Sequence, residues 1–484
     1  MNYKMMGRFN AMILAIEATF MIPPLLISLF LGEDASYQSF LVSIGITLVL
    51  AGLLAIFSRG AKKDFFAREG LICVGSSWIL MSALGALPLF FSGFVPNYVD
   101  ALFEMVSGFT TTGSTIITDL DVIPRGIIYW RSFSNWLGGM GVLVFLLALL
   151  PVSGRNQGFT MHLLRAESPG PDVGKLMPKM RQTAAVLYLC YLTLSLLDFI
   201  FLIAGGMPVF DAVCTAMSTA GTGGFGIYND SFAGFSPYIQ YVTATFMLLF
   251  GINFSCFYLI ILRQFRAVFK DEELRLYIGI TVASVALIAA NIFRIYGSIE
   301  ETLRHSFFQV SSLVTSTGFA SADFDLWPTF SKAILFLLMF VGACAGSTGG
   351  GLKLARVLLL CKSMRRNIAQ ILQPNKVKVI RVNAKPIDEK LVANTSAYFF
   401  VYMLLILVSF LIVSLDGFSI TTSLSAVVSC FNNMGPGFEA VGPACNFSDL
   451  SSLSKITLIF NMLAGRLEIF PILILFNPRA WKRG

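Results

Sequence analysis

The chain has 484 residues and a formal net charge of +8; 56% of its residues are apolar and 13% are charged. Soluble domains carry about 25% charged residues, so this composition excludes a set of ordinary soluble domains. It favours a membrane protein whose basic loops lie beside anionic lipid, and it argues against nucleic acid as a partner.

Ten apolar stretches are long enough, or nearly so, to cross a bilayer, which takes ~20 residues. Basic residues precede the first stretch, but no small-residue cleavage site follows it, so we expect a retained span rather than a signal peptide. In chain order the predicted spans are 9–31, 37–58, 71–99, 132–154, 182–210, 231–262, 276–293, 333–352, 391–415 and 456–478.

The basic residues divide between the two sides that these spans define. If the N-terminus is cytoplasmic, 28 of the 35 Lys and Arg residues fall in cytoplasmic segments. This is the bias of the positive-inside rule, and it predicts that both termini are cytoplasmic. Fifteen of the 27 acidic residues then face outward. They could concentrate cations at a pore mouth, or they could simply mirror the same rule.

Four short semi-polar segments recur after the first two spans, each between an outward-going and an inward-going span. The apolar part of each has about 12 residues, which is too short to cross a bilayer, so each should enter from the outer face and return. They are 100–114, 210–225, 305–319 and 422–438, and they end in T-T-T-G-S, T-A-G-T-G-G-F, T-S-T-G-F and N-N-M-G-P-G-F.

A shared spacing supports the repeat. A serine lies six residues before the glycine in three segments, as Ser107, Ser312 and Ser429. In the second segment the register stays open, because Ser218 fits only if the glycine is Gly224 rather than Gly223.

Irregular backbone at membrane depth must be buried in protein or line a water-filled cavity. One such segment alone would indicate a helix-packing patch or an ordinary loop. Four in the same topological position predict a pore whose backbone carbonyls replace the hydration shell of a cation.

The endings T-T-T-G-S-T, T-G-G-F, S-T-G-F and N-N-M-G-P-G resemble those of the TrkH/KtrB potassium transporter family, and the two extra N-terminal spans resemble its TrkH branch. The resemblance implies an all-α integral membrane fold related to potassium channels. Four pseudo-symmetric helix–pore loop–helix units would follow two extra transmembrane helices, giving ten spans and four re-entrant pore loops. The expected divisions are 1–65 for the extra helices and 66–155, 176–266, 272–372 and 388–484 for the units.

The resemblance also assigns a selectivity filter. Its residues would be Thr111, Thr112, Gly113, Ala220, Gly221, Thr222, Gly223, Ser316, Thr317, Gly318, Asn433, Met434 and Gly435. Bound potassium is expected there, and no covalent cofactor. No loop has the Tyr-Gly ending of a tetrameric potassium channel, so we expect few ion sites and only modest selectivity over sodium.

Residues 342–351 read G-A-C-A-G-S-T-G-G-G. Each glycine inside a helix costs about 1 kcal/mol relative to alanine, so this helix should break near mid-membrane. Close packing through glycines at four-residue spacing fits the same residues equally well. The resemblance favours an intramembrane loop that obstructs the pore, with a gate formed by Gly346, Ser347, Thr348 and Gly349.

Arg466 lies within the last predicted span, where an arginine is rare and usually functional or paired. We expect it to face the pore, where it would repel cations or bond the gate. Pairing with Asp198 or Glu17 is the alternative.

The resemblance implies potassium uptake across a bacterial inner (plasma) membrane by a homodimer with a cytosolic nucleotide-binding regulatory subunit of the TrkA type. The chain itself should not be an enzyme, because it lacks a complete nucleotide-binding or hydrolase motif. The units start and end on the cytoplasmic side, and such parallel repeats favour a channel-like pore. A secondary active potassium symporter coupled to protons or sodium is the alternative.

Overall fold

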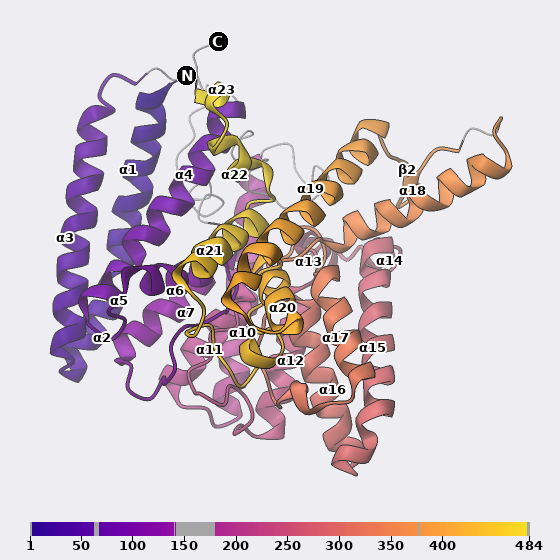
Figure 1. Cartoon of the computed structure of the whole chain (residues 1–484), viewed down its shortest axis with the longest axis horizontal. Coiled ribbons are helices and arrows are strands. Elements are labelled where there is room, and N and C mark those ends of the chain that lie inside the picture. The colour runs from indigo at the N-terminus through magenta and orange to yellow at the C-terminus, as the bar shows by residue number, and fades with distance from the viewer. Residues whose placement is uncertain (1, 62–66, 140, 142–179, 376–377, 482–484) are drawn as a thin grey trace.

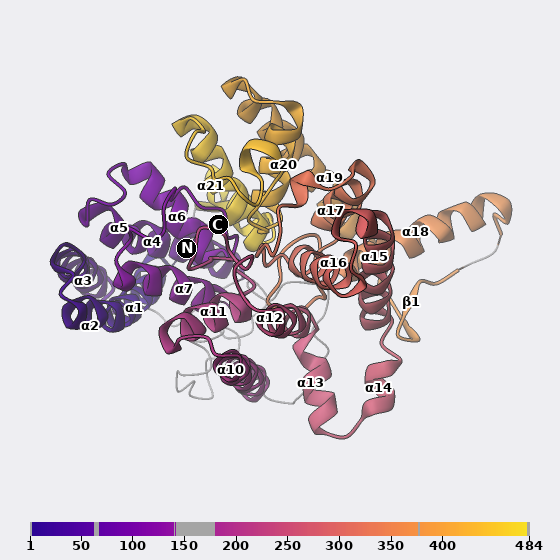
Figure 2. The ribbon, with the colours of Figure 1, turned by 90° about the horizontal axis from the view of Figure 1, so that it is seen from below.

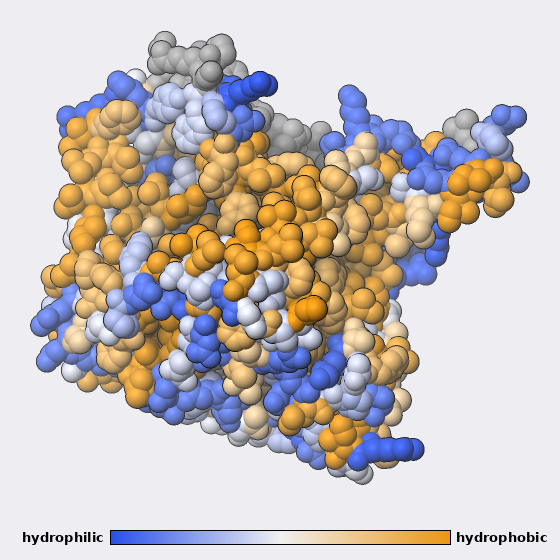
Figure 3. Space-filling view, in the orientation of Figure 1, coloured by the Kyte–Doolittle hydropathy of each residue, from blue (hydrophilic) through white to orange (hydrophobic). Residues whose placement is uncertain are grey.

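The computed structural model describes residues 2–61, 67–139, 141, 180–375 and 378–481. Helices account for nearly all of its regular structure (Figure 1). Within the described residues, six helices are long and apolar enough to cross a membrane, and a seventh span results if one bent pair is counted. Figure 3 shows a broad apolar band across the middle of one face, with hydrophilic residues gathered at its upper and lower margins. The described part of the chain is therefore built as a multi-pass membrane protein.

The first three helices form a separate layer at one side of the molecule (Figure 1). Prolines at the start of α2 and the left-handed Gly32 at its end shape the turn between α2 and α3. Much of α3 is exposed, as expected for a lipid-facing helix. The bounds are α1 (Tyr3–Phe20), α2 (Ile22–Leu31) and α3 (Asp34–Phe57).

The first two repeats follow. The first contains α4 (Ala67–Gly85), α5 (Leu87–Phe91), α6 (Tyr98–Phe109) and α7 (Arg125–Gly139). The predicted end of this unit, up to residue 155, lies outside the described residues. The second contains α10 (Met180–Ala204), α11 (Val209–Gly221), α12 (Pro237–Phe250) and α13 (Phe254–Ile261). Helices α12 and α13 meet at 91°, so the predicted span 231–262 is bent or broken.

The short helix α14 (Phe265–Phe269) leads into the third repeat. This repeat contains α15 (Glu272–Tyr296), α16 (Ile299–Val314), the 3-10 helix η1 (Phe324–Leu326), α17 (Thr329–Val341) and α18 (Leu354–Leu372). Strands β1 (Arg381–Val382) and β2 (Lys385–Pro386) pair antiparallel, with Arg381 opposite Pro386. Together α18 and the hairpin form an arm that projects from the helical body (Figure 1).

The fourth repeat completes the chain. It contains α19 (Glu389–Val413), η2 (Ser414–Asp416), α20 (Ile420–Phe431), η3 (Glu439–Val441), α21 (Ser452–Arg466), α22 (Phe470–Leu475) and α23 (Pro478–Trp481). The hydroxyl group of Tyr3 donates to the carbonyl oxygen of Trp481 at 2.5 Å, so the first and last described helices meet. The predicted total of ten spans stays a prediction.

Helices α6, α11, α16 and α20, which we call the short helices, have 12, 13, 16 and 12 residues. At 1.5 Å per residue they reach only ~18–24 Å, which is less than the ~30 Å of a hydrocarbon core. Three of them begin at a side-chain cap, formed by Asn97, Ser298 and Ser419. Most residues of each short helix are buried. The four follow one another around the middle of the molecule in chain order (Figure 2).

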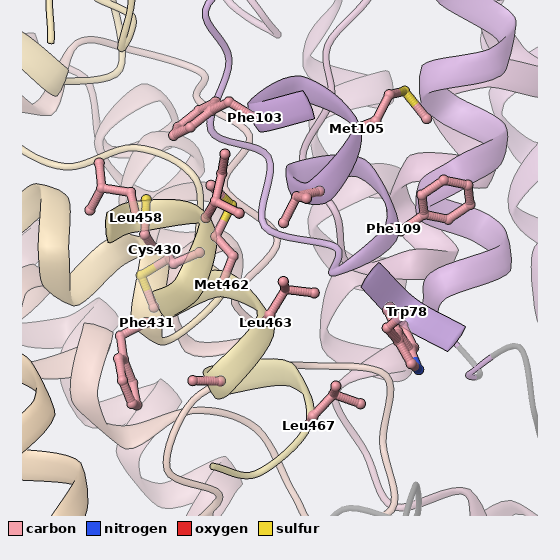
Figure 4. Close-up of a cluster of buried hydrophobic side chains, with 14 of the residues drawn as sticks. Trp78, Phe103, Met105, Phe109, Cys430, Phe431, Leu458, Met462, Leu463 and Leu467 are labelled. Carbon is pink, nitrogen blue, oxygen red and sulfur yellow. The ribbon is translucent and has the colours of Figure 1, made fainter. Parts of the chain in front are cut away.

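Apolar packing joins the fourth repeat to the first. Phe103 and Phe109 of α6 belong to the same buried cluster as Phe431 of α20 and Met462 of α21 (Figure 4). Helices 320 residues or more apart in the sequence thereby become neighbours, which closes the circle of repeats.

Candidate functional site

Each short helix leads into a loop with a shared backbone geometry; we call 110–114, 221–225, 315–319 and 432–436 the glycine loops. A side-chain-bearing residue near the start of each loop has positive φ, which is uncommon. These residues are Thr111, Thr222, Ser316 and Asn433, with φ of 57°, 51°, 57° and 53°. A glycine two positions later also has positive φ. These are Gly113, Gly224, Gly318 and Gly435, with φ of 84°, 71°, 90° and 94°.

The torsions resolve the register of the second loop. Gly224 takes the position of Gly113, so the predicted filter segment Ala220–Gly223 begins too early and stops one residue short. Ala220 and Gly221 are still helical, as the last residues of α11. Consecutive glycines hid this register in the sequence, because either glycine can adopt positive φ at little cost.

The glycine loops touch one another in a closed cycle. A Cβ atom would lie 2.4 Å from the Gly223 carbonyl oxygen if added to Gly113, 1.9 Å from that of Thr317 if added to Gly224, 2.2 Å from that of Met434 if added to Gly318, and 3.0 Å from that of Thr112 if added to Gly435. Each loop therefore packs its glycine against a carbonyl of the next loop, and the fourth loop returns to the first. Only glycine leaves room for that approach.

All four of these glycines line a single cavity of about 170 Å³. Its wall also includes Ser114, Arg131 and Phe225, together with exit segments that follow the glycine loops. No Asp or Glu side chain is among the described residues that line it. The groups closest to a bound cation would therefore be backbone carbonyls and hydroxyls rather than carboxylates.

The side chains that support the loops differ among the repeats. In the first and third loops, hydroxyl groups pair at 2.8 Å, Thr110 with Thr112 and Thr315 with Thr317. In the fourth loop the Asn433 amide donates to the Thr112 hydroxyl at 2.9 Å and to the Met462 carbonyl at 3.0 Å. The backbone geometry is therefore fourfold, whereas its support is not.

The exit segment of the fourth loop is anchored to two other elements. The Glu439 backbone N–H donates to the Asp325 carboxylate at 2.8 Å. The Glu439 carboxylate accepts from Ser419 and Thr422 at the start of α20. The hydrogen bond from Ser419 lowers the pKa of Glu439 below its usual value, because it stabilises the charged form. This segment therefore ties the fourth repeat to the third.

Below two of the loops, the glycine-rich run breaks its helix as predicted. Helix α17 ends at Val341 and α18 begins at Leu354, which leaves the irregular residues 342–353, called here the break segment. A Cβ atom on Gly349 would lie 2.8 Å from the Thr315 carbonyl oxygen, and one on Gly350 would lie 2.4 Å from that of Asn432. The break segment thus packs against the third and fourth loops at the ends of their helices.

The break segment satisfies part of its backbone at the bend between α12 and α13. The Cys344 N–H donates to the Gly251 carbonyl at 3.1 Å, and the Phe254 N–H donates to the Gly346 carbonyl at 3.0 Å. Its Gly350 N–H donates to the Ser316 hydroxyl. Two irregular stretches therefore pair with each other at membrane depth, as unsatisfied backbone there requires.

Three charged side chains hold the break segment. Arg466 donates to the Thr348 carbonyl at 2.9 Å and also to the carbonyls of Gly138 and Gly139 at the end of α7. The Lys353 ammonium donates to the Gly349 carbonyl. The Ala345 N–H donates to the Glu273 carboxylate at 2.6 Å. Of the two roles expected for Arg466, these contacts favour bonding to the predicted gate.

Sequence reasoning passed over Glu273 and Lys353. Both lie in segments predicted as cytoplasmic, yet Lys353 is 3% exposed and Glu273 is 9% exposed. Glu273 follows Asp271 and Glu272, which gives it the pattern of an acidic helix start. A buried position could have been suspected for Lys353 alone, because it directly follows the apolar, glycine-rich run.

Comparison with known proteins gives concordant matches along the chain. A family model described as "TrkH: Cation transport protein" matches residues 37–483. The Trk system potassium uptake protein TrkH of Salmonella typhimurium is 35% identical over 489 residues, covering 100% of both chains. TrkG of Escherichia coli is 33% identical over 467 residues, covering 96% of this chain and 95% of its own.

A solved structure matches with the same extent. The crystal structure of the potassium transporter TrkH from Vibrio parahaemolyticus superposes with a TM-score of 0.87 at 31% sequence identity, and the match covers 100% of each chain. The arrangement of helices described above is therefore that of a known transporter fold.

Proposed function

Because the chain belongs to the TrkH family of cation transport proteins, we propose that it takes up potassium through a central, channel-like pore. Members of this family are transport proteins rather than enzymes, and curated relatives are named as potassium uptake proteins. The pathway would run through the cavity lined by the four glycines and then past the break segment.

The observation that carries this proposal is the closed cycle of glycine loops. Four carbonyl-bearing segments with matching torsions surround one axis and contact each other in order. Such a ring can replace the hydration shell of a cation with oxygen atoms that carry no full charge, so that the ion binds and still leaves. The proposed filter residues are those assigned from the sequence, with Gly224 added in the second loop.

Modest selectivity for potassium over sodium follows from the same loops. Each has one shared glycine position, and the residue before that glycine is Thr112, Gly223, Thr317 or Met434. Unequal residues supported by unequal hydrogen bonds give the ring less uniform geometry than four identical chains would. Ion sites should be few, and discrimination should depend on how firmly the loops are held apart.

The proposed gate is the break segment, with Gly346, Ser347, Thr348 and Gly349 at its centre and Arg466 as its latch. Support comes from its contacts with the undersides of two glycine loops and from the Arg466 hydrogen bond to Thr348. In this position the segment and the arginine charge would obstruct the pathway until the segment moves.

Regulation would come from the cytoplasmic side. The arm formed by α18 and the hairpin carries Lys362, Arg365, Arg366, Arg381 and Lys385, and α18 has no acidic residue. We assign it to docking of a cytosolic nucleotide-binding subunit of the TrkA type. The working unit would be a homodimer in a bacterial inner membrane, with both termini in the cytoplasm.

Flux measurements in liposomes test this proposal. Purified protein, reconstituted with and without a TrkA-type subunit, should move potassium down its electrochemical gradient and at a rate that an imposed proton or sodium gradient does not change. Transport driven uphill by either gradient would establish the symporter alternative instead. Absence of potassium flux in both preparations would refute the proposed function.

A further inference from the structure

A buried ion pair lies directly behind the first glycine loop. The Glu104 carboxylate on α6 and the Arg131 guanidinium on α7 are 2.7 Å apart, and their side chains are 0% and 2% exposed. Removing two charges from water is costly, and a well-packed apolar pair is often at least as stable. Stability alone is therefore a weak reason for this pair to stand next to the proposed filter.

Glu104 holds the exit of the first loop. Its carboxylate accepts from the Thr115 hydroxyl at 2.9 Å and 3.1 Å and from the Ile116 N–H at 2.9 Å. These two residues follow Gly113 by two and three positions. The carboxylate thus fixes the backbone that leaves the loop, and Arg131 fixes the carboxylate.

Arg131 also contacts the second loop. The centre of its guanidinium lies 4.2 Å from the ring centroid of Phe225, which directly follows Gly224. Its Nη1 has no hydrogen-bond partner among the described residues, and its residue lines the same cavity as the four glycines. A guanidinium over an aromatic face gains a cation–π attraction, which is larger when the site is desolvated.

The other repeats have no charge at the matching position. Nine residues before the loop glycine, they carry Thr215, Gln309 and Ala426 where the first repeat carries Glu104. Gln309 reaches its own exit segment with a neutral bond, from its amide to the Ala322 carbonyl at 3.1 Å. A neutral side chain can therefore hold one exit segment, so the charged pair in the first repeat must serve a second contact.

We propose that Glu104 and Arg131 are positioning residues that set the spacing between the first and second filter loops and thereby determine selectivity between potassium and sodium. Arg131 reaches both loops, through Glu104 on one side and Phe225 on the other. Glu104 neutralises the Arg131 charge, which would otherwise face the ion pathway. This inference rests on the proposed function, since it assigns a role within the same filter.

The test compares the potassium-to-sodium permeability ratio of four proteins in liposomes, measured from reversal potentials: wild type, Glu104→Gln, Arg131→Gln and the double variant. We expect each single variant to lower the ratio by at least about threefold, because neighbouring coupled groups give effects of that size. The double variant should recover part of the loss, since it removes both charges and can retain a neutral hydrogen bond.

Two further variants separate positioning from folding. Phe225→Leu keeps the ion pair and an apolar side chain but removes the ring face, so it should lower the ratio while the protein elutes as wild type on size exclusion. Glu300→Gln removes a carboxylate that is 55% exposed and pairs with Arg304 on α16. This control should leave the ratio unchanged.

The outcomes distinguish this inference from the function beneath it. A wild-type protein without potassium flux would refute the proposed function. A conducting wild type whose ratio is unchanged in Phe225→Leu and in every correctly folded Glu104 or Arg131 variant would overturn the positioning role alone. An equal loss in Glu300→Gln would overturn it as well, because a general charge effect would then explain the result.

Discussion

Arg466 donates a hydrogen bond from Nη1 to the Thr348 carbonyl oxygen at 2.9 Å, although the two residues are 118 positions apart. The bond joins the last residue of α21 to the break segment between α17 and α18. A second guanidinium nitrogen reaches the Gly139 carbonyl at 2.8 Å. One arginine therefore connects elements of the first, third and fourth repeats beneath the glycine loops.

Replacing Arg466 by alanine should increase basal potassium flux several-fold. The substitution removes the hydrogen bond to Thr348 and also a positive charge beside the proposed pathway. The initial rate of rubidium or potassium entry into liposomes measures the effect. Arg466→Lys is the matched comparison, because it keeps the charge and loses the two-nitrogen geometry. Flux equal to wild type in a well-folded Arg466→Ala protein would contradict the latch.

Shortening the break segment should also raise flux. Deleting Gly346, Ser347, Thr348 and Gly349 removes the residues proposed to obstruct the pathway, while α17 and α18 stay intact. We expect faster ion entry without the regulatory subunit and little further activation when that subunit is added. If the deletion variant elutes as wild type and conducts no faster, the segment is not the gate.

Glu273 provides an independent test of the same segment. Glu273→Ala leaves the Ala345 N–H without its acceptor, and an unsatisfied buried donor costs about 1–3 kcal/mol. That cost falls on the closed arrangement, so the segment should open more often and flux should increase. Glu272→Ala is the control, since the neighbouring carboxylate contacts Lys362 and the Asn383 backbone instead. Equal flux in the two variants would argue against a specific role for Glu273.

Gly224→Ala tests the ring and its register. The new Cβ atom would lie 1.9 Å from the Thr317 carbonyl oxygen, on a backbone with φ of 71° that disfavours a side chain. We expect potassium uptake to fall at least tenfold in a growth assay on limiting potassium. Gly279→Ala is the control, because nothing lies within 4 Å of its added Cβ. Uptake retained in Gly224→Ala would mean that the loops do not pack as described.

The short helices, their loops and the helix break were predictable because each is written in local sequence. Length and glycine spacing limit a segment such as 305–319 to a re-entrant shape, whatever surrounds it. The Glu104–Arg131 pair was not predictable in this way. Both residues were simply counted among outward-facing charges, and only the packing of α6 against α7 brings them together behind the first loop.

The register of the second loop shows a different limit. Gly223 and Gly224 have the same intrinsic freedom, so no local rule selects between them. The choice is made by the neighbouring loop, whose Thr317 carbonyl occupies the space beside Gly224. Likewise, Lys353 was assigned to a cytoplasmic loop by its charge, whereas the Gly349 carbonyl draws it into the protein.

The cycle of glycine contacts also bears on how the repeats could diverge after an ancestral duplication. Each glycine meets the main chain of the next loop, not its side chain, so the identity of the adjoining residue is left free. Threonine, glycine, threonine and methionine can then occupy that position within one protein. A lesion at any one glycine, by contrast, would be transmitted to its neighbour, and so the four copies share a common vulnerability despite their separate histories.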